Sequence, residues 1–160
     1  MIVFLDLEET VIDEWGSDLL LPANIEAIRR LLQGNSVHLG LMSWAVWENE
    51  RDKLKFTHDI QPYVEEALGF KFHPDLTWSM DDWAGEVFKH TGLTLDRKED
   101  MFDMFKKEEV LFKLARHHPL FRDEMVILVD DAVEHDMTLR VPSRGCTVKF
   151  LNINNMVKNV

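Results

Sequence analysis

The chain has 160 residues, of which 46% are hydrophobic and 29% charged, a balance typical of one folded globular domain rather than a disordered chain. Its formal net charge of −11 makes nucleic acid an unfavourable partner, because a polyanion would be repelled. The single cysteine excludes an intrachain disulfide, and no apolar stretch approaches the roughly 18 residues of a membrane helix. We therefore expect a cytoplasmic protein without a membrane segment.

Short apolar runs alternate with helical patterns along the chain. In chain order the pattern predicts a strand at Ile2–Leu5, a helix at Pro22–Leu32, a strand at 37–42, a helix at 44–54, a short strand at 76–80, a helix at 82–90, one or two helices at 97–116, and strands at 125–129 and 147–151. Two of these runs, the first and 125–129, lack apolar/polar alternation, as strands buried on both faces do. The pattern predicts an α/β fold with three layers, in which helices cover both faces of a doubly wound, mostly parallel sheet.

Oxygen-bearing side chains follow three of the predicted strands. They are Asp6, Glu8 and Thr10 after the first, Ser43 after the second, and Asp130 and Asp131 after strand 125–129. Ligands of a doubly wound sheet bind beyond the carboxyl ends of its strands, so these residues are expected to share one site. Taken alone, Asp6 and Thr10 could cap a turn, and Ser43 could be a plain helix N-cap. Two adjacent acids after a buried strand, however, repel each other unless a cation lies nearby.

These strand ends resemble the motifs of the haloacid dehalogenase (HAD) superfamily. The segment 2–11, which reads IVFLDLEETV, resembles the first motif, an apolar strand followed by D-x-D-x-[T/V]. The strand that ends in Ser43 is similar to the second motif, and segment 125–131, which ends in a pair of acids, is similar to the fourth. The 37 residues from Asp6 to Ser43 leave no room for a large first cap domain. The layout is therefore similar to that of the capless group that includes magnesium-dependent phosphatase-1.

By this resemblance, residues 1–160 form a single HAD-like domain with a small insertion around 73–100. The resemblance implies that Asp6 attacks phosphorus and forms an aspartyl-phosphate, with Glu8 as the acid and base. It also implies a lysine that neutralises the carboxylates of the site. We expect Lys107 in this role, with Lys106 and Lys113 as the alternatives.

The cofactor that the resemblance implies is Mg²⁺. Its expected ligands are the Asp6 side chain, the Glu8 backbone carbonyl and one acid of the later pair. Asp131 is expected to bind the metal directly, and Asp130 to support the site or to pair with the lysine.

The implied substrate is a phosphorylated small molecule or a phosphoprotein. Thr10, Ser43 and Trp44 are expected to lie beside it, with Ser43 at the N-terminus of a helix whose dipole favours an anion. His117, His118 and His135 form no recognisable pattern of metal ligands and are expected on the surface or in loops.

Glu8 departs from the family pattern, because phosphatases of the superfamily have an aspartate at this position. Glutamate keeps the acid but moves the carboxyl group by roughly 1.5 Å. Two functions of different classes are therefore predicted. The first is a magnesium-dependent phosphohydrolase; the alternative is a catalytically silent HAD-like domain that binds a phosphorylated ligand or a protein partner. Dehalogenase-like chemistry has less in its favour, because the paired acids indicate a metal.

Overall fold

The computed structural model describes residues 1–46 and 49–159, and within them a single six-stranded sheet runs through the molecule. The strand order is β3-β2-β1-β4-β6-β5. The strands are β1 (Ile2–Leu5), β2 (His38–Leu41), β3 (Phe72–Thr77), β4 (Met125–Asp130), β5 (Met137–Val141) and β6 (Cys146–Asn152). Neighbouring strands pair in parallel except β5 and β6, which are antiparallel. The predicted α/β fold with a mostly parallel sheet is therefore confirmed.

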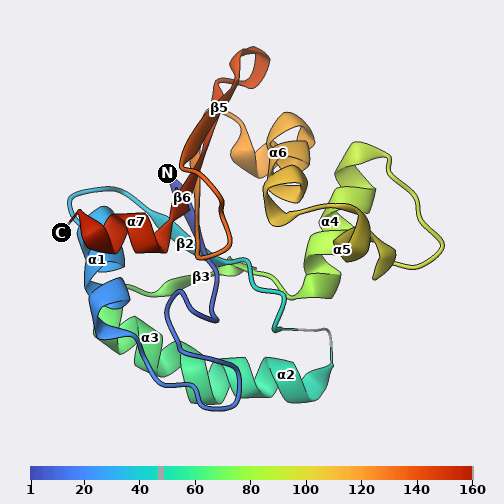
Figure 1. The fold of residues 1–160 in the computed structure, drawn as a ribbon. Coiled ribbons are helices and arrows are strands. Elements are labelled where there is room, and N and C mark those ends of the chain that lie inside the picture. Colours follow the sequence, from blue (N-terminus) through green and yellow to red (C-terminus); the bar gives the residue numbers. More distant parts are fainter. Residues whose placement is uncertain (47–48, 160) are drawn as a thin grey trace.

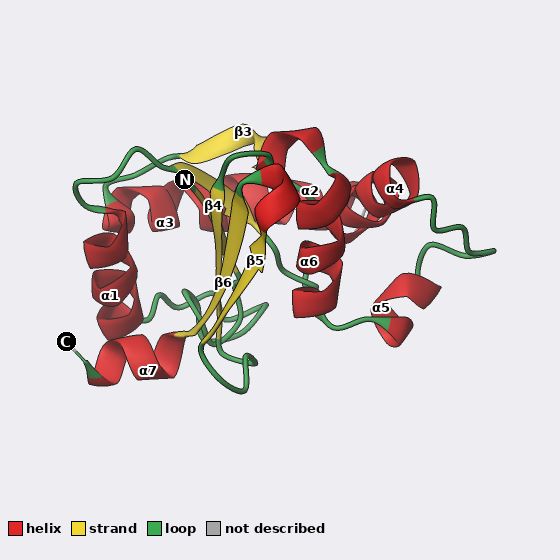
Figure 2. Cartoon of the chain, turned by 90° about the horizontal axis from the view of Figure 1, so that it is seen from above, coloured by secondary structure: helices red, strands yellow, loops and turns green. Residues whose placement is uncertain are grey.

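Helices cover both faces of the sheet, as Figure 2 shows from above. Buried side chains of α1 (Pro22–Leu32), α3 (Gln61–Leu68) and α7 (Ile153–Lys158) belong to one apolar cluster. Those of α4 (Met80–Thr91), α5 (Asp100–Met104) and α6 (Lys107–His117) belong to a second cluster on the other face. A further helix, α2 (Glu50–Lys55), continues through a π-helical turn, Phe56–Ile60, into α3. None of the helices in the described residues is long and apolar enough to cross a membrane.

The path of the chain creates a switch point next to β1. After β1 the chain builds β2 and β3 on one side, and it then returns to place β4 on the other side of β1. The register pairs Leu5 with Leu41 on one side and with Val129 on the other. In open sheets of this kind, the crevice at the switch point lies beyond the carboxyl ends of the strands. The residues that follow β1 and β4 therefore meet at this crevice.

Strand β1 is buried on both faces, which explains its unbroken apolar sequence. Val3 and Leu5 contribute to one core cluster, whereas Ile2 and Phe4 contribute to the other. The Phe4 ring packs so closely on β2 that a Cβ atom at Gly40 would lie 2.6 Å from the ring. A side chain at Gly40 would therefore collide with the core, because real Cβ contacts are longer than this.

Two predicted elements differ most from those in the structure. The helix expected at 44–54 begins only at Glu50, because the Asn49 side chain caps it by accepting the backbone N–H of Asp52; residues 47–48 of that prediction lie outside the described part. The strand expected at 76–80 is β3 and ends at Thr77. It ends there because Ser79 caps α4: its hydroxyl accepts the Asp82 backbone N–H, and the Asp82 carboxylate accepts that of Ser79.

The segment around 73–100, expected as a small insertion, contributes directly to the sheet and the core. It supplies most of the edge strand β3 and all of α4. Trp83 of α4 is fully buried, and its indole N–H donates to the Leu41 carbonyl oxygen at 3.1 Å. The residues between α4 and α5 form the long loop that projects at the right of Figure 1.

Candidate active site

A pocket of about 680 Å³ opens beyond the carboxyl ends of β1 and β4. Its lining comes from the loop after β1, the residues after β2, the start of α6 and the loop after β4. Of the described residues that line it, nine are acidic and two are lysines. The pocket thus lies at the switch point and is strongly negative.

Lys107 lies between two buried carboxylates at the base of the pocket. Its Nζ is 2.8 Å from Oδ1 of Asp6 and 2.7 Å from Oδ2 of Asp130. Asp6 is 6% exposed and Asp130 1% exposed, so these charge-assisted hydrogen bonds are shielded from water. Lys107 is the first residue of α6, and the start of this helix brings its side chain to the two strand ends.

The backbone and a buried hydroxyl hold the two carboxylates in place. Thr10 Oγ1 donates to Oδ2 of Asp6 at 3.2 Å, and the Asp6 backbone N–H donates to the Val129 carbonyl oxygen of β4 at 3.1 Å. Asp130 Oδ1 accepts the backbone N–H of Ala132 at 2.9 Å. Both aspartates are therefore fixed from the side that faces away from Lys107.

Burial and the charges of their neighbours shift the pKa values of three of these groups. Burial raises the pKa of Asp6; the Lys107 ammonium opposes this and the neighbouring Asp130 adds to it. Burial alone would lower the pKa of Lys107, but the charges of Asp6 and Asp130 outweigh it and raise that pKa above its usual value. Burial and the carboxylates of Asp130 and Asp6 raise the pKa of Asp131 to about 7. One ammonium therefore does not compensate three carboxyl groups.

These three carboxyl groups could together hold a metal ion. Oxygen atoms of Asp6, Asp130 and Asp131 all lie within 4.8 Å of one another. Oxygen ligands of this kind suit a hard divalent cation, which would also relieve the mutual repulsion of the carboxylates. The backbone carbonyl oxygen of Glu8 accepts no hydrogen bond from any described residue, so it is available as a further ligand.

Three other predicted residues line the same pocket. Glu8 is partly exposed, and its Oε2 accepts the backbone N–H of Trp15 at 3.0 Å. Ser43 is buried, and its Oγ accepts the backbone N–H of Ala45 at 3.2 Å. The Trp44 ring packs edge-to-face on Phe102 of α5, with centroids 4.7 Å apart.

The structure distinguishes the three candidate lysines. Lys107 alone of the three bonds to the Asp6 and Asp130 carboxylates within the described residues. Lys106 is exposed at the edge of the pocket. Lys113 lies elsewhere, with its Nζ 4.6 Å from the centroid of the Phe105 ring.

Two expectations about the substrate side are wrong. Thr10 is fully buried and does not line the pocket, because its hydroxyl is turned inward to Asp6. Ser43 does not begin a helix, because the chain forms a turn after it and α2 starts only at Glu50. The helix that begins at the pocket is α6, whose first residues are Lys107 and Glu108.

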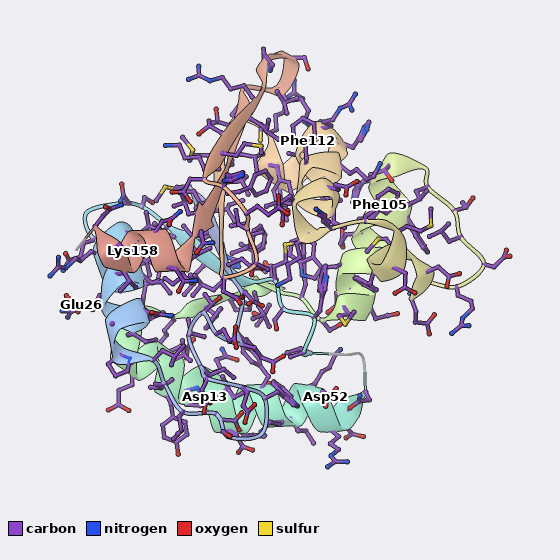
Figure 3. All side chains as sticks on the ribbon, in the orientation of Figure 1. Asp13, Glu26, Asp52, Phe105, Phe112 and Lys158 are labelled. Carbon is purple, nitrogen blue, oxygen red and sulfur yellow. The ribbon has the colours of Figure 1, made fainter. Side chains whose placement is uncertain are left out.

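Sequence reasoning missed several acidic residues of the pocket. They are Glu9, Asp13, Glu14, Glu108 and Glu134. Each lies within a few residues of a predicted site residue, and that proximity is the signal that could have indicated them. Figure 3 shows Asp13 in the long loop that follows β1.

His118 lies in the connection between α6 and the turn Pro119–Phe121, as expected of a loop residue, but its side chain is buried beside α4 and not on the surface. Its Nε2 lies 2.7 Å from Oε2 of Glu86, and Nε2 of His90 lies 3.2 Å from the same oxygen. Nδ1 of His118 accepts the Leu120 backbone N–H, so in the neutral ring Nε2 carries the hydrogen and donates to Glu86. A metal at Nε2 would need the lone pair of that nitrogen, so we interpret the cluster as a hydrogen-bonded network.

Fold and site together define an α/β protein with a doubly wound sheet and a carboxylate–lysine pocket at its switch point. Comparison of the chain with protein-family models, curated proteins and solved structures gives no match.

Proposed function

We propose that the protein is a magnesium-dependent phosphohydrolase of the HAD type that transfers the phosphoryl group of its substrate to Asp6. The observation that carries this proposal is the position of Lys107 Nζ, within 2.8 Å of Asp6 and 2.7 Å of Asp130, at the base of an open pocket. The first motif, the lysine and the paired acids are far apart in the sequence but adjacent here. This is the combination that phosphoryl transfer through an aspartate requires.

Asp6 is suited to act as the nucleophile because its carboxylate lines the pocket and is fixed by two neighbours. In the first step a carboxylate oxygen of Asp6 forms a bond to phosphorus while the bond from phosphorus to the leaving oxygen breaks. In the second step water attacks the same phosphorus and regenerates the Asp6 carboxylate. Lys107 offsets the negative charge that gathers around phosphorus in both steps.

Glu8 is suited to move the protons of the two steps. Its Oε2 is held by the Trp15 backbone N–H, and Oε1 accepts no hydrogen bond from a described residue. Glu8 donates a proton to the leaving oxygen in the first step and takes a proton from the attacking water in the second. The Trp15 backbone N–H thereby fixes one oxygen of Glu8, whose side chain is one methylene longer than that of an aspartate.

Residues on the other wall can bind the phosphoryl oxygens. Ser43 Oγ accepts an N–H from Ala45, which leaves its own hydroxyl hydrogen free to donate into the pocket. Mg²⁺ fits the Asp6 and Asp131 carboxylates and the Glu8 carbonyl oxygen, and when bound it would supply the positive charge that lets a carboxylate approach a phosphate dianion.

The test is phosphate release from p-nitrophenyl phosphate, measured with Mg²⁺ and with EDTA. We expect release that needs Mg²⁺ and that falls about a thousandfold or more in Asp6→Asn. Asp103→Asn is the matched control, because Asp103 is exposed on α5 and does not line the pocket. Release that persists in EDTA and in Asp6→Asn would refute the mechanism.

Glu8→Asp separates the phosphohydrolase from the catalytically silent alternative, a domain that binds a phosphorylated ligand or a protein partner. If wild type is inert and Glu8→Asp releases phosphate with Mg²⁺, the site binds but does not turn over, and the alternative holds. Comparable activity in both proteins excludes it.

A further inference from the structure

The pocket carries a second set of acids beyond the Asp6–Lys107–Asp130 cluster. We name these five the rim carboxylates: Glu9, Asp13, Glu14, Glu108 and Glu134. They come from three separate parts of the chain: the loop after β1, the start of α6 and the loop after β4. The fold thus brings negative charge to the pocket from several sides.

The rim carboxylates form no ion pairs within the described residues, although the charges of Lys106 and Lys107 act on Glu108. Across residues 1–46 and 49–159, none of the five forms an ion pair, whereas acids elsewhere do, such as Glu26 with Arg29 and Asp18 with Lys55. Some of them are nevertheless held in place by the loop itself. Asp13 Oδ1 accepts the backbone N–H groups of Glu14 and Leu19, at 2.7 and 2.9 Å. Their negative charge is therefore not balanced by ion pairs within the described residues.

An aromatic surface lies in the same pocket. Trp44 is partly buried, lines the pocket, and is held from behind by its edge-to-face contact with Phe102. One ammonium already lies near its indole, since Lys107 Nζ is 5.5 Å from the ring centroid. A tryptophan ring that lines the same pocket as several carboxylates is an environment that suits an ammonium group.

We propose that the substrate is a phosphate monoester whose alcohol part carries a positive charge, such as an alkylammonium. This inference rests on the proposed function and assigns the substrate class of the same site. A phosphate dianion adds two negative charges to a pocket in which nine acids face two lysines. A cationic alcohol part offsets this charge at the rim carboxylates, whereas a sugar phosphate or a nucleotide can donate hydrogen bonds to them but brings no positive charge.

The test compares phosphocholine with 3,3-dimethylbutyl phosphate, which has the same shape but a carbon atom in place of the charged nitrogen. Both are assayed for phosphate release with Mg²⁺. We expect kcat/KM for phosphocholine to be about tenfold higher, mainly through a lower KM, and the preference to shrink as salt is added. Equal kcat/KM for the two esters, or a preference for the neutral one, would overturn the inference.

Variants of the rim carboxylates control for any intrinsic difference in reactivity between the two esters, because that difference is the same for every variant of the protein. In the double variant Glu14→Gln/Glu134→Gln, we expect the preference for phosphocholine to fall about fivefold, while the control Glu66→Gln leaves it unchanged. Glu66 is exposed on α3 and does not line the pocket, so this control removes the same kind of charge from a remote place. An equal preference in wild type and double variant would assign it to leaving-group chemistry and overturn the inference.

Failure of this inference is distinguishable from failure of the proposed function. If p-nitrophenyl phosphate is hydrolysed but neither alkyl ester is, the phosphatase stands and the substrate class is wrong. If no phosphate ester is hydrolysed, the proposed function fails. Calorimetric binding of the two alkyl esters to wild type with Mg²⁺ then decides the charge preference, and equal affinities overturn it.

Discussion

Replacing Lys107 with methionine removes the one ammonium that contacts both buried aspartates. Methionine keeps much of the aliphatic volume but leaves the carboxylates of Asp6 and Asp130 without a cation. The Lys107 side chain is 13% exposed, that of Asp6 9% and that of Asp130 2%, so water can replace the lost partner only in part. Loss of one member of a buried ion pair costs about 3–5 kcal/mol of unfolding free energy, and we expect Lys107→Met to fall in this range at pH 8.

The loss should depend on pH in a defined direction. In wild type the raised pKa of Lys107 means that its contribution to stability is present below pH 10.5 and is lost as pH rises above it. In the variant, the pKa of Asp6 rises further, because the opposing charge of Lys107 is gone. The native state then binds more protons than the unfolded state above about pH 4, so stability falls as pH rises. We therefore expect a smaller loss at pH 5 than at pH 8.

The measurement is urea-induced unfolding at pH 5, pH 8 and pH 9, in EDTA so that no metal contributes. Lys106→Met is the control, because Lys106 is adjacent in sequence but exposed and makes no ion pair with a described residue. We expect the control to change stability by less than about 0.5 kcal/mol. If Lys107→Met costs less than about 1 kcal/mol, or the same at pH 5 and pH 8, the electrostatic reasoning about the pocket is refuted.

Two further predictions follow from the core and the pocket. Gly40→Ala should destabilise the fold by about 1–3 kcal/mol, because the new Cβ would lie 2.6 Å from the Phe4 ring. Gly85→Ala on α4 is the control: its new Cβ meets no atom within 4 Å, and the change should stabilise the fold by up to about 1 kcal/mol. Urea-induced unfolding measures both changes. The pKa of Asp131, raised to about 7 from a usual 3.8, means that its carboxyl group costs stability as pH rises through that window. In EDTA, Asp131→Asn should therefore gain stability relative to wild type between pH 5 and pH 8, and an equal difference at the two pH values would contradict the assignment.

The parts of the fold that the sequence predicts well are those whose signals are local. Strand β1 and helix α1 have the predicted bounds, since an unbroken apolar run and a proline at the first helical turn are both visible within a few residues. Strand β5 is different. Met137 and most of its neighbours are exposed, and the strand exists because it pairs with β6 at the edge of the sheet. The two strands are joined by only residues 142–145, but a strand that is exposed at a sheet edge and held by pairing alone has little apolar pattern in its own sequence.

The candidate site follows the same division. Residues at strand ends, such as Asp6 and Asp130, could be predicted to meet because parallel strands bring their carboxyl ends to one edge. Which lysine joins them depends on where α6 begins, and a run of two lysines followed by two glutamates does not fix that point to one residue. The place of Ser43 was predicted, but not its local structure, because the helix cap lies six residues later at Asn49.

The charge arrangement of the pocket is difficult to explain by fold stability alone. Asp6, Asp130 and Asp131 surround a single buried ammonium, and apolar side chains of similar volume at such places often give an equal or more stable fold. Burial, together with the carboxylates of Asp130 and Asp6, raises the pKa of Asp131 to about 7, so a charged Asp131 is costly here. A divalent cation beside these carboxylates would remove that cost and, under the proposed function, would also prepare the pocket to receive a phosphate. Residues that cost stability while sharing one pocket follow the pattern expected of a functional site rather than a structural one.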